Sequence, residues 1–223
     1  MSNTLIFILA GLIGYVFGSI PFGFLFVRLV KRIDLRDVGS GRTGGTNSMR
    51  AAGPVVGALT GLSDVLKGAS AIWIARLLFS RVLNVELLPW AEMLCGIGTI
   101  MGHNWSIFLG FKGGAGTGPN IGWATAIWWP MFPIGVLTVV GIIVTVGMAS
   151  IASLSMGAII PLVFAIRYAT EKDTTPAYLV GGLITLVIVS WALRPNIKRL
   201  LDGSERIVGP RARRKEAKAA GNR

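Results

Sequence analysis

Long apolar runs recur along the chain and are separated by shorter polar segments. A bilayer core about 30 Å thick needs roughly 20 apolar residues in a helix that rises 1.5 Å per residue. The pattern therefore predicts an all-α fold, a polytopic membrane helix bundle. The expected spans are Leu5–Leu29, Val55–Phe79, Leu87–Phe111, Val136–Met148, Ile151–Ala169 and Ala177–Leu193.

The segment Ile121–Pro133, between the third and fourth runs, is rich in tryptophan and ends in two prolines. If Ile121–Met148 is wholly helical, its roughly 28 residues extend about 42 Å, too short for two full spans and a turn. We therefore expect its first half to be a short or re-entrant helix. Such a helix lies at membrane depth only where protein or a polar cavity satisfies its backbone. This predicts a cavity beside the glycine-rich loop that precedes it.

The basic residues orient the predicted bundle. Six lie at or after the end of the first run, and ten more lie between Arg194 and the C-terminus. The opposite loops, residues 80–86 and 170–176, carry only Arg81 and Lys172. The positive-inside rule then places the N-terminus outside and the C-terminus inside, with residues 31–53 in the cytoplasm. This N-out/C-in arrangement requires an odd number of crossings, so we expect about seven.

The composition supports a membrane protein. Hydrophobic residues make up 52% of the 223 positions and charged residues only 14%, whereas a soluble domain carries roughly a quarter. A single cysteine, Cys95, excludes a disulfide scaffold. The 22 Lys and Arg against 10 Asp and Glu give a net charge of +12. We expect residues 1–205 to form one membrane domain and 206–223 a disordered basic cytoplasmic tail that contacts anionic lipids rather than nucleic acid.

The first unusual loop spans residues 38–50. Its four glycines allow close backbone approach to a ligand, and its hydroxyls, amide and Arg50 suit a phosphate. Backbone N–H groups in such loops form anion-binding nests. A flexible connector between two spans is the alternative. The candidate phosphate-binding residues are Gly44, Gly45, Thr46, Asn47 and Arg50, and Ser40 supplies a hydroxyl beside them.

The second loop spans residues 102–118. It lacks the Lys-Ser or Lys-Thr pair that closes a P-loop, which argues against nucleotide hydrolysis. Lys112 can still bind phosphate, together with Gly113, Gly114 and Gly116. His103 is the only histidine. A role as general base and a role as a hydrogen-bonded residue at a helix end are equally compatible with its position. Position 108 is Phe, so the His-x4-Asp dyad of one large acyltransferase class is absent.

Other polar residues lie within or beside the predicted spans. Asn196, in the third loop at residues 194–205, faces the site if that loop is not merely an interfacial anchor. Asp64 and Lys67 lie three residues apart on one helical face, and an ion pair that supports the site is favoured over direct catalysis. Ser150 and Ser153 either line the site or bond to backbone carbonyls.

The three loops, in this order, resemble those of the bacterial acyl-phosphate-dependent glycerol-3-phosphate acyltransferases, the PlsY family. The first family motif reads close to S-G-N-P-G-A-T-N-x-x-R, the second has G-H followed by F-x-x-F-K/R-G-G-K-G, and the third reads H-x-x-N-I-x-R-L-x-x-G-x-E. The resemblance covers nearly the whole chain, including the intramembrane D-x-x-K at Asp64 and Lys67. The matching positions are Ser40, Gly41, Gly44–Asn47, Arg50, Gly102, His103, Phe108, Phe111–Gly114, Gly116, Asn196, Ile197, Arg199, Leu200, Gly203 and Glu205.

The chain departs from the family pattern in three places. Arg42-Thr43 replaces Asn-Pro, Ala115 replaces the last lysine of the second motif, and Leu193 replaces the histidine of the third. A charge-assisted hydrogen bond contributes about 1.5–3 kcal/mol, so these losses predict weaker substrate binding. We hypothesise that Arg42 supplies the missing positive charge from the opposite loop.

The resemblance implies transfer of a fatty acyl group from acyl phosphate to the 1-hydroxyl of glycerol 3-phosphate, a step of phospholipid biosynthesis. It implies a multi-pass protein of the bacterial plasma membrane with a cytoplasmic active site. Because acyl phosphate is already activated, holding the two substrates together with proton transfer to a phosphate oxygen is the expected mechanism, and it needs no metal or cofactor. Ser40, Asn196 and His103 are the expected catalytic residues. The expected partners are the two substrates and membrane lipids, with no nucleic acid, for a monomer. Two alternatives remain: a weakened paralogue that binds phosphorylated lipid precursors, and an organic-phosphate transporter.

Overall fold

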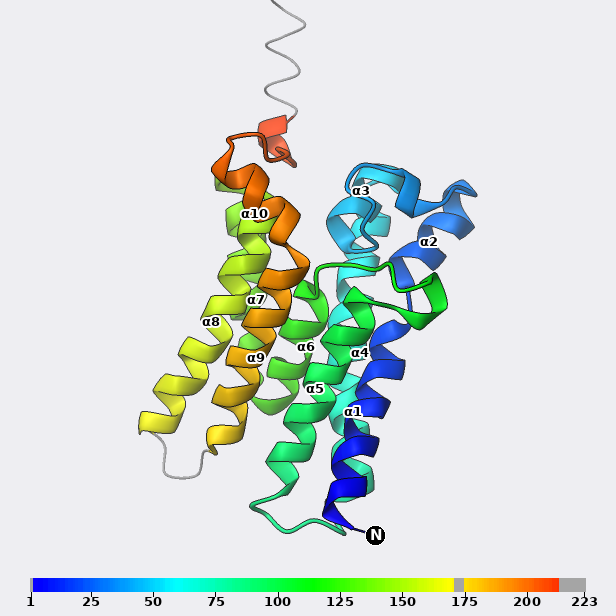
Figure 1. Ribbon diagram of the computed structural model, residues 1–223. Coiled ribbons are helices and arrows are strands. Elements are labelled where there is room, and N and C mark those ends of the chain that lie inside the picture. Colours follow the sequence, from blue (N-terminus) through cyan, green and yellow to red (C-terminus); the bar gives the residue numbers. More distant parts are fainter. Residues whose placement is uncertain (1, 171–174, 213–223) are drawn as a thin grey trace, which may run out of the picture.

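The computed structural model describes residues 2–170 and 175–212, and within these ranges it contains helices and no strand. The long helices run between two ends of an elongated bundle, with the N-terminus at one end and α3 and α10 at the other (Figure 1). The short 3-10 helices are η1 (Leu35–Asp37) and η2 (Ile107–Leu109). The α-helices are α1 (Asn3–Ser19), α2 (Phe22–Lys31), α3 (Gly45–Ala52), α4 (Pro54–Phe79), α5 (Leu88–Asn104), α6 (Thr117–Ile127), α7 (Met131–Thr145), α8 (Ala149–Thr170), α9 (Pro176–Ala192) and α10 (Arg194–Leu201).

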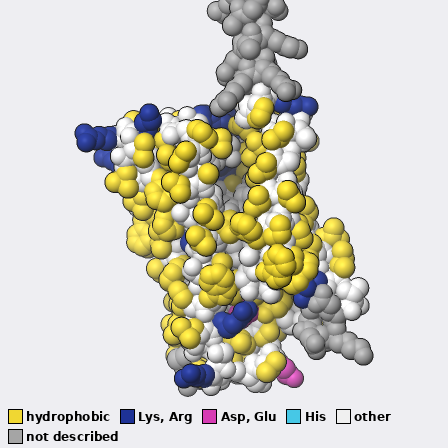
Figure 2. All heavy atoms as spheres, turned by 180° about the vertical axis from the view of Figure 1, so that it is seen from behind, with side chains coloured by type: hydrophobic (Ala, Val, Ile, Leu, Met, Phe, Trp, Pro, Cys, Tyr) yellow, Lys and Arg dark blue, Asp and Glu magenta, His cyan; other side chains and the backbone are white. Residues whose placement is uncertain are grey.

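Three of the described helical segments are long and apolar enough to cross a membrane: Asn3–Lys31, Pro54–Phe79 and Ala149–Thr170. A fourth is obtained if α9 and α10, which meet at an angle of 67°, count as one broken span. Apolar side chains cover much of the outer surface between the two ends of the bundle (Figure 2). The predicted all-helical membrane bundle is therefore confirmed, while the count of seven spans stays a prediction.

The helix boundaries differ from the predicted spans at the polar end of the bundle. The first apolar run is broken between α1 and α2, because Pro21 has no N–H with which to continue the helix. Residues 45–52, predicted as part of a loop, form helix α3. The predicted span Leu87–Phe111 ends as a helix at Asn104, and the chain then enters the second glycine-rich loop.

The expected short helix between the third and fourth runs is present as α6, whose 11 residues rise about 16 Å. Helix α7 packs against α6 and runs in the opposite direction. The start of α6 meets the first turn of α8 through the Thr117 and Ser153 hydroxyls, 2.5 Å apart. The turn after α7 meets the C-terminal segment, where the Val208 N–H donates to the Gly147 carbonyl. The α6–α7 pair therefore begins and ends on the same side as α3 and α10.

Helices α1 and α5 approach closely because glycines line both sides of their contact. A Cβ on Gly14 would overlap the carbonyl oxygen of Cys95, and one on Gly98 would overlap that of Gly11. Gly18 and Gly102 make equivalent contacts one turn further along each helix. Small residues spaced four apart on both helices are typical of membrane helix pairs that pack backbone to backbone.

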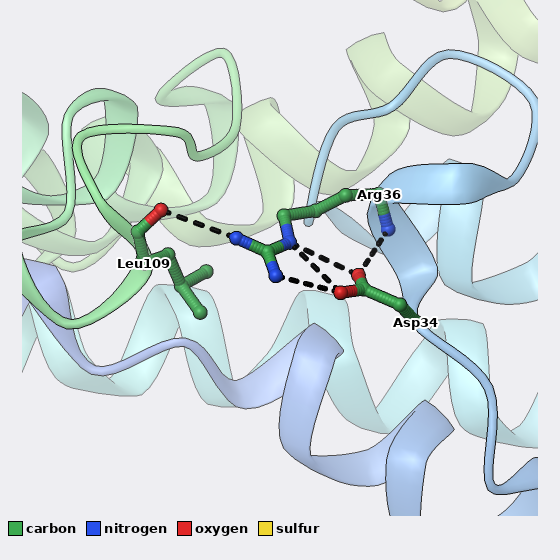
Figure 3. A network of polar contacts seen from close by, with 3 residues as sticks. All are labelled: Asp34, Arg36 and Leu109. Carbon is green, nitrogen blue, oxygen red and sulfur yellow. Dashed lines mark hydrogen bonds and ion pairs between the residues drawn. The ribbon is translucent and has the colours of Figure 1, made fainter.

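Polar contacts join the loops that follow this helix pair. The Arg36 guanidinium forms a salt bridge with Asp34 and also donates to the carbonyl of Leu109 at 3.3 Å (Figure 3). The Ser106 hydroxyl donates to the carbonyl of Ser19 at 2.6 Å. The hydrogen bond from Arg36 lowers the pKa of Asp34. The first and second loops are thus fixed to each other beside the α1–α2 break.

The glycine contact predicts a position-dependent effect of a single methyl group. We expect Gly14→Ala to destabilise the protein by about 1–3 kcal/mol, because the Cβ forces α1 away from α5. A matched Gly141→Ala in α7, whose Cβ would meet nothing within 4 Å, is expected to be neutral or stabilising by up to about 1 kcal/mol. Unfolding in mixed detergent micelles measures both changes. Equal stability of the two variants would contradict this packing.

Candidate active site

All three glycine-rich or basic loops contribute to one cavity of about 490 Å³ near the α3 and α10 end of the bundle. Its polar lining comes from the loop before α3, from α4 and α5, from the start of α6 and α8, and from α10 and the chain after it. The cavity brings together the predicted residues Ser40, Arg42, Gly44, Gly45, Thr46, Asn47, Arg50, Asp64, His103, Ser150, Ser153 and Asn196. Segments far apart in the sequence therefore converge as expected.

The Arg42 side chain connects the three loops. One guanidinium nitrogen, Nη1, donates to the Gly114 carbonyl of the second loop at 2.9 Å. The other, Nη2, donates to the Ala192 carbonyl at 2.6 Å and to Asn196 Oδ1 at 3.1 Å. Burial and the nearby Arg199 lower the pKa of Arg42, but an arginine keeps its charge in such a site. This one cation therefore fixes the spacing between the walls of the cavity.

Asn196 lies between Arg42 and a buried carboxylate. Its Oδ1 accepts from Arg42, and its Nδ2 donates to Glu205 Oε1 at 2.9 Å. Ser150 also donates to Glu205, and Arg199 pairs with it at 2.9 Å. The two charged neighbours fix which way the amide points, and one of its two N–H groups stays available to a ligand in the cavity.

Asn47 holds the first loop closed. Its Nδ2 donates to the carbonyls of Val38 and Arg42 at 2.9 and 2.8 Å, with a longer contact to Leu35. Its Oδ1 accepts from the Ser40 N–H and from Arg50 Nη1. The amide is thus committed to the loop and positions Ser40 and Arg50, while a direct contact of Asn47 with phosphate stays a prediction.

His103, Lys67 and Asp64 form a buried cluster on one side of the cavity. Lys67 Nζ lies 3.0 Å from Asp64 Oδ1, which is the ion pair that we expected. The same nitrogen lies 2.9 Å from the Ile20 carbonyl and 2.9 Å from His103 Nδ1. A charged lysine ammonium has N–H donors and no acceptor, so Lys67 can only donate in its contact with His103 Nδ1. His103 Nδ1 must then accept, and the ring carries its proton on Nε2.

The second loop is placed differently from the rest. Lys112 is exposed and lies outside the cavity lining. Gly113, Gly114 and Gly116 are also absent from the lining. A Cβ on Gly114 would overlap the His103 ring, and one on Gly113 would overlap the His103 carbonyl. These glycines are therefore required for close packing on α5. A phosphate contact from Lys112 or the three glycines stays a prediction that the geometry does not favour.

Ser150 and Ser153 combine the two roles considered for them. Both line the cavity. Ser150 donates to Glu205, whereas Ser153 bonds to both the Thr117 hydroxyl and the Ala149 carbonyl. The sequence interpretation missed Thr117 as a lining residue and gave Glu205 no role beyond its place in a motif. A carboxylate among several arginines was the signal that could have identified Glu205.

The cavity continues from its cationic mouth into an apolar cleft between α4 and α7. Leu62, Phe132, Val136 and Val140 line it and are also about 40–50% exposed on the outer surface. A side chain can line the cavity and also be exposed on the outer surface only where the cavity opens through the side of the bundle. The hollow between the two halves of the bundle is visible from this side (Figure 2). A Cβ on Gly61 would meet only open space in this cleft.

Within the described residues, no group of three or more His, Cys, Asp and Glu side chains could hold a metal ion. Polar groups and cations instead gather at one end of an apolar cleft that opens toward the lipid-facing surface. This fold and cavity define a class: α-helical membrane proteins with a site for an amphiphile that has an anionic head group.

Comparison with known proteins identifies the family within this class. The family model for glycerol-3-phosphate acyltransferase matches residues 8–203. The glycerol-3-phosphate acyltransferase of Erythrobacter litoralis is 36% identical over 90% of this chain and 94% of its own. The enzyme of that name from Prochlorococcus marinus (strain MIT 9211) is 34% identical over 88% of this chain and 92% of its own. The chain belongs to the glycerol-3-phosphate acyltransferase family.

Solved structures agree with this assignment. The crystal structure of PlsY (YgiH), an integral membrane glycerol 3-phosphate acyltransferase, in its glycerol 3-phosphate form superposes with a TM-score of 0.75. The two chains are 30% identical, and the match covers 94% of this chain and 96% of the other. The same protein in its lysophosphatidic acid form gives a TM-score of 0.74 at 27% identity, over 91% and 95% of the two chains. The resemblance inferred from the three loops is confirmed.

The hydrogen bonds of Arg42 predict a large loss of stability when its charge is removed. We expect Arg42→Met to lower the free energy of unfolding by about 2–4 kcal/mol, because it leaves buried acceptors on three segments without a donor. Arg194→Met is the matched control, since within the described residues that exposed arginine bonds only to the nearby Trp191 carbonyl and lies over the Trp191 ring. Its expected cost is about 0.5–1 kcal/mol. Similar losses for both variants in detergent unfolding would contradict the role of Arg42.

The lysine cluster predicts the protonation of the only histidine. In tag-free protein labelled with 15N-histidine, NMR is expected to show one neutral imidazole protonated on Nε2. Lys67→Met removes the donor to Nδ1, so the Nδ1-protonated form is expected to gain population. A wild-type ring protonated on Nδ1, or on both nitrogens, would contradict the geometry.

Proposed function

We propose that the protein transfers a fatty acyl group from acyl phosphate to the 1-hydroxyl of glycerol 3-phosphate, giving lysophosphatidic acid and phosphate. The observation that carries this proposal is the continuity of a cationic mouth with an apolar cleft in one cavity. Both substrates have a phosphate, and one has an acyl chain that fits only the apolar part. The PlsY structures in their glycerol 3-phosphate and lysophosphatidic acid forms have the same fold and support this choice of ligands.

The reaction needs little from the protein beyond position and charge. The 1-hydroxyl oxygen attacks the acyl carbonyl carbon, the bond from that carbon to the phosphate oxygen breaks, and the hydroxyl proton moves to a phosphate oxygen, directly or through Ser40. Acyl phosphate is already activated, so holding the two reactants in contact supplies several kcal/mol of the barrier. Arg42 and the free N–H of Asn196 stabilise the developing oxyanion. His103 acts as a positioning residue, because Lys67 occupies its Nδ1.

The first loop and α3 bind phosphate. Arg50 presents a planar fork of donors at the cavity mouth, and Arg42 presents its charge deeper inside. The backbone at Gly44, Gly45 and Thr46 lines the cavity at the start of α3, where free N–H groups favour an anion. No cofactor enters this scheme.

The protein is oriented with its N-terminus outside and the cavity mouth facing the cytoplasm of a bacterium, in the plasma membrane. The concentration of basic residues at the α3 and α10 end supports this direction. The seven crossings are α1 with α2, then α4, α5, α6, α7, α8 and α9, with α6 too short to span fully. We propose that the protein acts as a monomer.

The three departures from the family pattern lie together in space. Arg42 donates to the carbonyls of Gly114 and Ala192, the residues that directly precede Ala115 and Leu193. The side chains of Ala115 and Leu193 both line the cavity beside the Arg42 guanidinium. Arg42, from the first loop, thus lies beside the two positions where the second and third family motifs have a lysine and a histidine. This arrangement favours an exchange of one cation for another, and so an active enzyme, over a weakened paralogue.

Turnover by the purified protein tests the function and the exchange together. With acyl phosphate and glycerol 3-phosphate, we expect release of phosphate and formation of lysophosphatidic acid, with no loss of rate in EDTA. Arg42→Asn is expected to lower kcat/KM about 10- to 100-fold, the effect of one lost charge-assisted hydrogen bond. The triple change Arg42→Asn, Ala115→Lys and Leu193→His is expected to restore most of that loss.

Ala115→Lys alone is the control, and it is expected to lower activity because it places a second cation beside Arg42. If this single change raises activity while Arg42→Asn has no effect, the exchange is disproved. Binding of glycerol 3-phosphate without phosphate release from acyl phosphate would identify the weakened paralogue instead.

A further inference from the structure

The chain after α10 folds back over the cavity instead of leaving the protein at residue 205. Gly203, at a φ of +69°, reverses the chain direction. Two anchors then hold the segment: the buried Glu205 carboxylate, and the Val208 N–H, which donates to the Gly147 carbonyl at 2.7 Å. Residues 206–212, expected to begin a disordered tail, are thus packed on the α7–α8 turn, whereas 213–223 lie outside the described residues.

Arg206 lies between these two anchors and lines the cavity. Because Glu205 and Val208 are both fixed, the backbone of Arg206 has little freedom to move away from the mouth. Its side chain is exposed at the rim. From the sequence alone, Arg206 is expected to belong to the basic tail and has no predicted role in the site.

The charges that line the cavity are unbalanced at its mouth. Of the two carboxylates in the lining, Asp64 pairs with Lys67, and Glu205 pairs with Arg199. In the described part of the chain, neither Arg50 nor Arg206 pairs with a carboxylate. The lining residues with charged side chains are Arg42, Arg50, Asp64, Glu205 and Arg206.

Arg50 and Arg206 come from opposite sides of the cavity mouth, one from α3 and the other from the segment after α10. Among residues 2–170 and 175–212, Arg50 has one hydrogen bond, from Nη1 to Asn47 Oδ1, and its other N–H groups can donate to a ligand. Burial, and then the charge of Arg206, lower the pKa of Arg50. Two guanidinium groups whose charges repel across an opening are both stabilised when a dianion binds between them.

We propose that Arg206 is a phosphate-binding residue which, together with Arg50, holds the phosphate of glycerol 3-phosphate at the cavity mouth. The inference rests on the proposed function and adds a residue from the folded-back C-terminal segment to its acceptor site. Acyl phosphate has its own phosphate placed deeper, near Arg42, because its acyl chain must occupy the apolar cleft. Arg206 therefore acts on the binding of one substrate and not on that of the other.

Steady-state kinetics of Arg206→Gln test this assignment. The KM for glycerol 3-phosphate is expected to rise about tenfold or more, with kcat and the KM for acyl phosphate within about twofold of wild type. Arg206→Lys keeps the charge but loses the planar guanidinium. Its KM for glycerol 3-phosphate is therefore expected to lie between those of wild type and Arg206→Gln. Lys198→Gln is the matched control for net charge, because Lys198 is exposed on α10 and outside the cavity lining. Calorimetric titration with glycerol 3-phosphate provides an independent affinity.

The outcomes separate this inference from the proposed function. Wild-type protein that neither binds nor acylates glycerol 3-phosphate overturns both. Wild-type binding and turnover, with unchanged glycerol 3-phosphate affinity in Arg206→Gln, overturns the inference alone. A rise only in the KM for acyl phosphate overturns the assignment to the acceptor. A loss that Lys198→Gln reproduces shows a general charge effect and also overturns it.

Discussion

The buried charge of Arg42 sets the geometry of the site. A guanidinium that leaves water must find acceptors for its donors, or the cost of burial exceeds the gain in contact. Here the acceptors come from Gly114, Ala192 and Asn196, which lie 72, 150 and 154 residues away along the chain. Satisfying one side chain therefore brings three loops together. The buried Glu205 carboxylate, which pairs with Arg199, accepts from Asn196 one residue further along this network.

The apolar scaffold makes this convergence possible. The glycines of α1 and α5 bring two helices close together, so the loops that follow them start from fixed positions. The contacts of Arg36 with Leu109 and of Ser106 with Ser19 then fix the two loops against each other. Helix α6 packs mainly against α4, whereas α7 packs against α8, which leaves a lateral opening between α4 and α7. Rigid loops and an open side together suit a site that binds a polar head group tightly and admits an alkyl chain from the membrane.

Two polar networks share Gly114. The Lys67 cluster reaches this residue through the His103 ring, which lies against its Cα, and Arg42 reaches it through its carbonyl. Only a glycine fits between them, because any Cβ would overlap the ring. The intramembrane charges of Asp64 and Lys67 are thus connected to the cavity mouth through the His103 ring. This explains why a costly buried ion pair lies directly beneath the site.

The sequence by itself determined the all-helical membrane fold, the Asp64–Lys67 pair, the family, and the existence of a short helix before the fourth apolar run, although that helix lies at Thr117–Ile127 and not at residues 121–133. Each follows from local features: hydropathy over one helix length, residue spacing on one helical face, or the order of residues in a loop. The tertiary structure alone decided that Lys112 lies outside the cavity, that the Asn47 amide bonds within the first loop, and that Arg206 lines the cavity. These facts depend on which acceptors and charges from distant segments meet a given side chain. The packing of the whole bundle decides which of these groups meet. A hydrogen bond between residues 150 positions apart, such as that from Arg42 to Ala192, cannot be predicted from the sequence around either residue.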